Sequence, residues 1–441
     1  MANTIKQKRG TSDPGASDLV VGELAINTTD GGVFTKTDGG TVVEVGGGGL
    51  TGRTDSAGPF VTSLGHEAAD SVTSTSYNVT AIGYQAAKDT TGRGNIAIGR
   101  TSLVTNTSGE YNVAIGGNSL LSNTTADKNV GLGHSTLSSN TTGYENTAVG
   151  FRALKSNTTA VSNTAVGSDA LYSCTTGAGN TAVGYQAGNS ITTALYNTVV
   201  GYDSFTATTT GQYNAGLGFQ SGLRNTTGIS NTAVGYNALT FNATGSKNTV
   251  IGYQAVYGSS GNSNEENTAV GYQAGYSLST GSYNVMLGYQ AGNSITSGSN
   301  NLVLGYDADA SSATATNEIT LGNSSISTLR CNTQTISSLS DARDKTDVQE
   351  LPEGLDFISK LNPVKFQWQT RDGNSKDGTY EAGFIAQELQ SAQQNVDADY
   401  LGLVMDENPD RLEVSYGKLV PMLVKAIQEL KSEVDQLKAN V

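Results

Sequence analysis

Cysteine, histidine and tryptophan are nearly missing from this chain, whose 441 residues include only two, two and one of them, respectively. Cys174 and Cys331 lie far apart in the sequence, so they do not form the framework of a disulfide-stabilised domain, and we expect folding in a reducing compartment. The two histidines, His66 and His134, lie in or beside a repeated region described below. A Ser-His-Asp catalytic triad is therefore not expected.

Positive charge and long apolar runs are scarce as well. Lys and Arg number 25 against 39 Asp and Glu, which gives a net charge of −14 and a pI near 4.6. Binding to nucleic-acid phosphates needs clustered cations, so no nucleic-acid partner is expected. No run of about 18 apolar residues exists, so we expect no membrane insertion. The glycine-rich stretches lack the Lys-Ser/Thr ending of a phosphate loop, and no cofactor or metal is expected.

The chain is instead rich in glycine, and much of it recurs at a fixed step. The phrase Asn-Thr-Ala-Val-Gly occurs at Asn146–Gly150, Asn163–Gly167, Asn180–Gly184 and Asn231–Gly235. Counted on its glycine, the series runs from Gly83 to Gly322, and twelve of its fourteen steps are 17 residues, with one of 16 and one of 19. A short fixed period predicts one small unit stacked many times.

Composition divides the chain into three predicted regions. Residues 1–52 form a short mixed segment, and residues 53–339 hold the repeats and carry little charge. From residue 340 to residue 441 charged residues become frequent, and the only tryptophan, Trp368, lies there. We predict that residues 340–441 form a separate globular domain.

Each repeat has two apolar positions around its glycine. The residue just before the glycine is β-branched or Leu almost throughout, as at Ile115 and Val149, and we predict that it points inward because strand side chains alternate. A second apolar position follows four residues after the glycine, at Leu103, Leu120, Leu137, Leu154, Leu171, Phe205 and Leu239. Two short strands and two turns per repeat predict one coil of a parallel β-solenoid. Fourteen steps at about 4.8 Å predict a shaft of roughly 67 Å.

Such a narrow coil buries little apolar volume, so side-by-side association of chains is expected. The repeats resemble the head domains of trimeric bacterial adhesins, which carry a similar Asn-Ser-Val-Ala-Ile-Gly phrase at a somewhat shorter period. The resemblance implies a homotrimeric β-roll. The expected fold class is therefore mainly β, with a repetitive parallel β-solenoid or β-roll shaft followed by a C-terminal α+β domain that ends in a coiled-coil helix.

Ordered motifs run through the C-terminal region, at Ser340–Val348, Gly354–Ile358, Leu361–Trp368, Gly383–Leu389 and Val414–Pro421. Together they resemble the C-terminal intramolecular chaperone domain of phage endosialidases and tail fibres. The resemblance implies a domain that trimerises, assists the folding of the upstream fibre and then cuts itself off. It implies a serine peptidase that acts once, on its own chain.

The resemblance also implies roles for individual residues. In the family, the serine that opens the first motif is the nucleophile and cleavage falls on its N-terminal side, so Ser340 would attack the carbonyl of Leu339. Lys345 would serve as the base, because a serine hydroxyl is a weak nucleophile until a neighbour takes its proton. Asp341 and Arg343 match the motif as positioning groups. The spacing alone instead favours Ser340 as the N-cap of a helix, since serine followed by acidic residues often caps one.

The last apolar residues follow a heptad step, at Val420, Leu423, Ile427, Leu430, Val434, Leu437 and Val441. This spacing predicts a coiled-coil seam on a terminal helix, with Pro421 in the first turn, where proline is tolerated. β-branched residues at a and Leu at d favour two strands by themselves, whereas the family resemblance implies three.

The N-terminal segment resembles the opening of many phage fibre proteins, in Ile5–Thr11 and in Gly22–Asn27. The resemblance implies attachment to a tail or baseplate protein of the virion, with the basic residues Lys6, Lys8 and Arg9 facing an acidic partner. A disordered basic tail is the alternative. Alternating apolar residues at 19–27 and 32–45 predict small strands, and the four glycines at 46–49 predict a flexible joint.

Aromatic residues recur directly after the repeat glycine, at Tyr84, Phe151, Tyr185, Tyr202, Phe219, Tyr236, Tyr253, Tyr272, Tyr289 and Tyr306, and we call this set the aromatic ladder. It is interpreted as a structural stack or a chain–chain contact, with glycan binding as the alternative. The asparagine that opens each phrase is predicted to be structural, its side-chain amide capping turns.

These features and resemblances predict a phage tail fibre that adsorbs to a host surface receptor through the shaft around residues 290–339, and a glycan is the expected class of receptor. The polar start Met1–Gly10 carries no secretory signal, so the protein is expected to be made in the host cytoplasm and to leave in the virion. A bacterial trimeric adhesin would need such a signal and a membrane-anchoring C-terminus. A glycan-degrading tailspike would need paired carboxylates in the shaft, where the acidic residues are scattered, as at Glu110, Asp127, Glu145, Asp169 and Asp203.

Overall fold

The structure is a computed structural model. It describes residues 7–10, 24–27, 33–36, 42–44, 60–72, 77–259, 261–326, 328–330, 340–370, 376–406, 410 and 412–440. The chain divides into two compact units, Met1–Thr280 and Gly281–Val441. The predicted boundaries at 52/53 and 339/340 fall on or beside residues outside the described ones, as do the glycines at 46–49, so these boundaries stay predictions.

The first unit begins with a four-stranded sheet in the order β1-β2-β3-β4, formed by Gln7–Gly10, Leu24–Asn27, Val33–Lys36 and Val42–Glu44. β1 and β2 are parallel, and the other two pairs are antiparallel. The small strands predicted within residues 19–27 and 32–45 are therefore confirmed, with β2 in the first range and β3 and β4 in the second. Lys6 lies outside the described residues, as do the side chains of Lys8 and Arg9.

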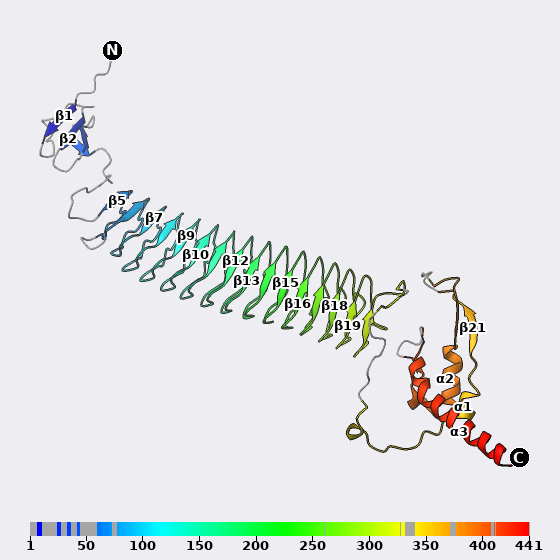
Figure 1. Cartoon of the computed structure of the whole chain (residues 1–441). Helices are drawn as coiled ribbons and strands as arrows, with labels where there is room; N and C mark the ends of the chain where they lie inside the picture. Colours follow the sequence, from blue (N-terminus) through cyan, green and yellow to red (C-terminus); the bar gives the residue numbers. More distant parts are fainter. Residues whose placement is uncertain are drawn as a thin grey trace. The chain divides into compact units, whose positions relative to one another are not determined.

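The rest of the first unit is a parallel β-solenoid whose strands stack as successive coils (Figure 1). Each strand pairs in parallel with the strand one repeat away, so that Thr147 aligns with Thr164 and Val149 with Val166. The strands are β5 Val61–Leu64, β6 Val79–Ile82, β7 Ile96–Ile98, β8 Val113–Ile115, β9 Val130–Leu132, β10 Thr147–Val149, β11 Thr164–Val166, β12 Thr181–Val183, β13 Thr198–Val200, β14 Ala215–Leu217, β15 Thr232–Val234, β16 Thr249–Ile251 and β17 Thr268–Val270.

The second unit starts with three strands of the same kind, β18 Val285–Leu287, β19 Leu302–Leu304 and β20 Ile319–Leu321. β18 pairs with β19 and β19 with β20, again in parallel. The predicted mainly-β solenoid fold is thus confirmed in both units.

The prediction that the residue before each glycine points inward is wrong. The central residue of the strand is the buried one: Ala148 is fully buried, whereas its neighbours Thr147 and Val149 are partly exposed. Leu132 and Leu217, which precede their glycines, are 44% and 53% exposed. A narrow coil has room for one small side chain from the strand and one large side chain from the turn, so the alternation runs in the opposite phase.

Two strands per coil were also predicted, and this is wrong. Each coil has one strand, usually of three residues, and the remainder is turns. Residues two and four positions after the glycine adopt left-handed backbone angles, as do Asp203 and Phe205 with φ of 53° and 47°. The turn nevertheless supplies the predicted second apolar position, because Phe205 and its leucine counterparts are fully buried. Burial of these large side chains offsets the cost of the left-handed backbone.

The glycine itself is required by the stacking. Gly201 has φ of +136°, and a Cβ on it would lie 2.2 Å from the carbonyl oxygen of Gly218 in the next coil. No side chain fits there, which explains why glycine recurs at the fixed step.

The buried asparagines form a hydrogen-bonded ladder, as predicted. The Asn197 amide nitrogen donates to Asn180 Oδ1 at 3.1 Å and to the carbonyl of Gly211 at 3.0 Å. Its oxygen accepts from the backbone and side-chain nitrogens of Asn214 at 3.0 and 3.1 Å. Each amide therefore joins three coils and satisfies buried backbone groups that the short strands leave unpaired.

The buried thiol of Cys174 is expected to make the stability of the folded chain decrease at alkaline pH. This thiol donates to the Gly177 carbonyl at 3.3 Å, and burial raises the thiol pKa from 9.0 to about 12. Above pH 9 the unfolded chain ionises this thiol while the folded chain does not, so the stability it contributes is complete below pH 9 and is lost as the pH rises towards 12.

In a Cys331→Ser variant at pH 8, a disulfide reagent such as DTNB is expected to modify the native chain at least ~100-fold more slowly than the denatured chain. Equal rates would contradict the burial of this thiol.

The C-terminal domain combines short helices with two antiparallel hairpins, β21–β22 and β23–β24. Its elements are the 3-10 turn η1 Ala342–Asp344, α1 Leu355–Ile358, β21 Val364–Gln367, β22 Tyr380–Gly383, α2 Ala386–Gln394, η2 Asp399–Leu401, β23 Val404–Met405, β24 Glu413–Val414, η3 Tyr416–Lys418 and α3 Leu419–Ala439. Its core contains Phe357, Leu389, Ala398, Leu401, Leu403, Val404, Leu419 and Met422.

Helix α3 is the predicted terminal helix, with Pro421 in its first turn. One face packs on the domain through Met422 and Ala426, and Glu429 Oε2 accepts a hydrogen bond of 2.6 Å from the Leu355 amide at the start of α1. The seam residues Val420 to Leu437 are 36 to 67% exposed, and Val441 lies outside the described residues. In the described parts of the chain, no helix has the length and apolarity to cross a membrane.

Candidate functional site

Ser340 and Lys345 meet at the start of the C-terminal domain. The single turn η1 reverses the chain between them, and the Lys345 amide donates to the Ala342 carbonyl at 3.3 Å to close the turn. Lys345 Nζ then lies 2.5 Å from Ser340 Oγ. A potential nucleophile and a potential base are therefore hydrogen-bonded to each other, five residues apart.

Asp341 holds this turn together. Its carboxylate accepts the Arg343 backbone N–H at 2.9 Å, as an N-cap, and binds the Arg343 guanidinium through Oδ2 at 2.6 Å. The guanidinium holds the pKa of the Asp341 carboxyl below its usual value, so the cap is charged at neutral pH. The interpretation of Ser340 as the N-cap is therefore wrong: Asp341 caps the turn and leaves the Ser340 hydroxyl free for Lys345.

Ser340, Asp341, Arg343 and Lys345 are all exposed in the single chain. Leu339, on the other side of the predicted cleavage site, lies outside the described residues. The geometry brings the four predicted residues of the motif together, and their roles in cleavage stay predictions. A lysine acts as a base only when it is neutral, and exclusion of water favours the neutral form. Efficient proton transfer from Ser340 to Lys345 therefore requires that the pair be shielded from solvent.

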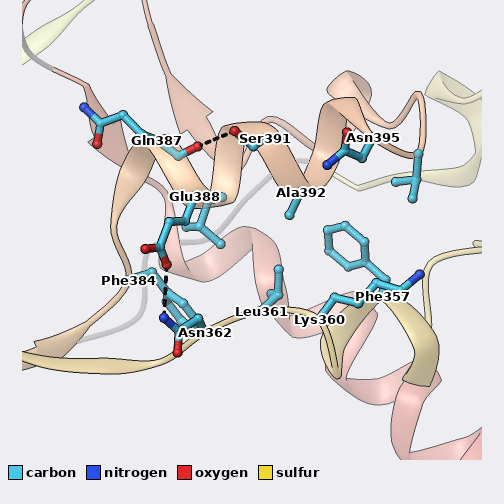
Figure 2. Close-up of a pocket in the computed structure, with 12 residues that line it drawn as sticks. Phe357, Lys360, Leu361, Asn362, Phe384, Gln387, Glu388, Ser391, Ala392 and Asn395 are labelled. Carbon is cyan, nitrogen blue, oxygen red and sulfur yellow. Dashed lines mark hydrogen bonds between the residues drawn. The ribbon is translucent and has the colours of Figure 1, made fainter.

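A cavity of about 580 Å³ lies elsewhere in the same domain (Figure 2). Phe357 and Phe384 contribute apolar surface, and Glu388 on α2 accepts a hydrogen bond of 3.2 Å from the Asn362 amide. The Ser391 hydroxyl donates to the Gln387 carbonyl at 2.9 Å. Its lining contains no nucleophile paired with a base. Sequence reasoning named three motifs that contribute to its lining, at Gly354–Ile358, Leu361–Trp368 and Gly383–Leu389, but it missed the cavity because nothing in their spacing indicates that they meet in the fold.

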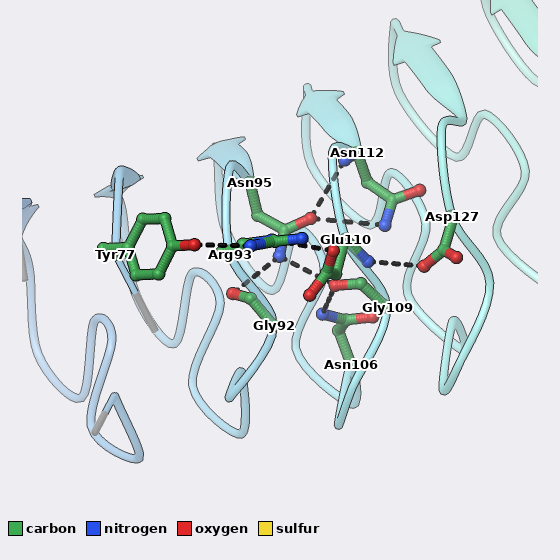
Figure 3. A network of polar contacts seen from close by, with 9 residues as sticks. All are labelled: Tyr77, Gly92, Arg93, Asn95, Asn106, Gly109, Glu110, Asn112 and Asp127. Carbon is green, nitrogen blue, oxygen red and sulfur yellow. Dashed lines mark hydrogen bonds and ion pairs between the residues drawn. The ribbon is translucent and has the colours of Figure 1, made fainter. Parts of the chain in front are cut away.

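In the shaft, Figure 3 shows two of the acidic residues named above, Glu110 and Asp127, in a polar network across coils. Arg93 Nε lies 2.9 Å from Glu110 Oε2, and the same guanidinium donates to the Tyr77 hydroxyl. The Glu110 amide donates to Asp127 Oδ1 at 2.7 Å. Glu110 is thus an ion-pair partner that links neighbouring coils.

Other carboxylates of the shaft are engaged in the same way. Glu145 pairs with Lys128 at 3.3 Å, and the nearly buried Asp169 pairs with Arg152 at 2.8 Å. These contacts tie carboxylates to cations one coil away and do not resemble the paired carboxylates of a glycosidase.

Comparison with known proteins gives one match. Residues 340–397 match the family described as chaperone of endosialidase. No curated protein and no solved structure matches the chain. The matched segment starts at Ser340 and includes the Ser340–Lys345 turn, the cavity and helix α2.

Proposed function

We infer that a β-solenoid followed by a chaperone-of-endosialidase domain makes this a protein of the phage tail-fibre or tailspike type. From this premise, we propose that the chain is a tail fibre protomer that cuts itself between Leu339 and Ser340. The observation that carries the cleavage proposal is the 2.5 Å contact between Lys345 Nζ and Ser340 Oγ, at the first residue of the matched segment.

The reaction follows from these two groups. Neutral Lys345 takes the proton of the Ser340 hydroxyl, and Oγ attacks the carbonyl carbon of Leu339. The C–N bond between Leu339 and Ser340 then breaks, and the leaving nitrogen takes the proton back from Lys345. The product is an ester between Leu339 and Ser340 Oγ. Water hydrolyses this ester, which leaves a carboxylate on Leu339 and a free amine on Ser340.

Assembly into a homotrimer completes the proposal. Ser340 and Lys345 are exposed in one chain, and α3 presents an apolar heptad seam that is also exposed. Three α3 helices joined along this seam would bury it, and the neighbouring chains would shield the Ser340–Lys345 pair from water. Cleavage would then report that assembly is complete.

In the mature fibre, the N-terminal segment attaches to a tail or baseplate protein of the virion. The shaft around residues 290–339, at the end of the cut chain, contacts a host surface receptor, with a glycan as the proposed class. The protein is made in the host cytoplasm and reaches the receptor in the virion. The ion-paired shaft carboxylates give no support to a glycan-hydrolysing tailspike.

The test is the intact mass of the purified chain beside a Ser340→Ala variant. The wild type is expected as two pieces divided between Leu339 and Ser340, and the variant as one piece. A wild type that stays whole in an assembled trimer would contradict self-cleavage. The C-terminal domain would then be a permanent part of the fibre.

A further inference from the structure

The aromatic ladder is stacked over a long, continuous run. From Tyr185 through Tyr202, Phe219, Tyr236 and Tyr253 to Tyr272, successive ring centroids lie 5.0 to 5.3 Å apart with interplanar angles of 4 to 22°. This spacing matches the distance between neighbouring strands, so each coil adds one ring. The rings are 38 to 47% exposed.

Stacking decides which part of each ring is available. The faces of the four inner rings are covered by the rings of adjacent coils, so only their edges are open. A sugar that stacks on an aromatic side chain needs an open face, which these rings do not offer. The ladder therefore suits an apolar partner that packs against ring edges.

The residues before the glycines are exposed apolar side chains as well. Leu217, Ile251 and Val270 are 36 to 53% exposed, one position before their glycines, and the ladder rings lie one position after the glycines. At roughly 200 Å² per aromatic side chain, the six rings from Tyr185 to Tyr272 at about 43% exposure leave roughly 500 Å² uncovered. A stable protein–protein interface needs about 800 Å² per partner, so this run by itself supplies more than half of that area.

We propose that the aromatic ladder is the surface along which further copies of this chain pack side by side in the shaft. Between Gly184 and Tyr272 this surface repeats at every coil, and neither the position before the glycine nor the position after it carries a charged residue. A partner that matches it along its length needs the same period, and a second copy of this chain has that period. This surface is distinct from the seam on α3.

A periodic surface does not fix the register of the chains. A shift by one coil would restore nearly the same ring contacts between Tyr185 and Tyr272. The C-terminal domain has no such repeat, and, resting on the proposed function, we assign it the alignment of the shafts before it is removed. The need for an aligning domain thus follows from the ladder.

Cross-linking of the full chain tests the proposal. In a Cys331→Ser background, Tyr236→Cys places a thiol on the ladder, and Tyr213→Cys is the matched control. Tyr213 is also a stacked, exposed tyrosine, next to Tyr196, but it precedes the asparagine of its repeat and lies off the ladder. A short bismaleimide is expected to join Tyr236→Cys chains at least tenfold more efficiently than Tyr213→Cys chains, and Tyr253→Cys provides a second ladder variant.

The outcomes separate this proposal from the proposed function, because residues 213 and 236 remain in the shaft whether or not the chain is cut. Ladder-specific links between uncut chains would support the interface and contradict self-cleavage. Equal linking at both positions in well-folded variants would overturn the interface. So would a monomeric chain in which a linear dextran protects Tyr236→Cys from maleimide, which would assign the ladder to a glycan.

Discussion

The chain with Lys345→Arg is expected to assemble but to remain in one piece. Arginine retains the positive charge and the reach of lysine, but its guanidinium stays protonated and cannot accept the proton of the Ser340 hydroxyl. Loss of a general base typically slows a reaction 10²- to 10⁴-fold. Intact mass followed over time measures the rate, and light scattering shows whether the trimer has formed.

Lys360→Arg is the matched control. Lys360 lies in the same domain and pairs with Asp356 at 2.6 Å on the surface, so its replacement should leave the cleavage rate unchanged. Cleavage of Lys345→Arg at the wild-type rate would show that the lysine contributes only its charge. Another group would then have to serve as the base.

The second large effect is expected from Asn197→Ala in the buried asparagine ladder. The substitution leaves the Gly211 carbonyl and the Asn214 amide without their partners, and both residues are buried. Each unpaired buried group costs about 1–3 kcal/mol, so the free energy of unfolding should fall by about 3–5 kcal/mol. Urea unfolding of Ser340→Ala chains with and without the substitution measures this loss.

Asn189→Ala provides the control, because Asn189 is only partly buried and its amide donates to the Asp169 carbonyl at 3.1 Å. Its loss should cost about 1 kcal/mol or less. Hydrogen exchange should show the Asn197→Ala effect concentrated in the adjoining coils, since each coil contacts mainly its neighbours. Equal losses for the two variants would contradict a structural ladder of buried amides.

Local patterns in the sequence predicted those parts of the structure that repeat or follow a helical period. The 17-residue step predicts the stacked coils, Phe205 and the matching leucines are buried as expected, and the heptad step predicts α3. Each of these depends on periodic side chains and on backbone limits that act within one or two repeats. The ordered motifs from Ser340 likewise predicted the chaperone match.

Only the tertiary structure decided which of the alternating strand side chains face the core. In the sequence, either Ala148 or Val149 could point inward, and only the width of the folded coil places Ala148 inside and leaves Val149 partly exposed. Val149 and its counterparts before the other glycines therefore leave apolar side chains at least partly exposed, whereas the sequence interpretation had placed them in the core.

At the candidate site, the family resemblance named Ser340, Asp341, Arg343 and Lys345, whereas the spacing alone favoured Ser340 as a helix cap. The folded turn excludes the cap, because the Asp341 carboxylate takes the capping position and Lys345 reaches back to the Ser340 hydroxyl. Capping depends on where the chain reverses, which is a property of three-dimensional backbone geometry. Sequence by itself thus determined the repeat and the motif, and the fold determined which side chains face each other and which face outward.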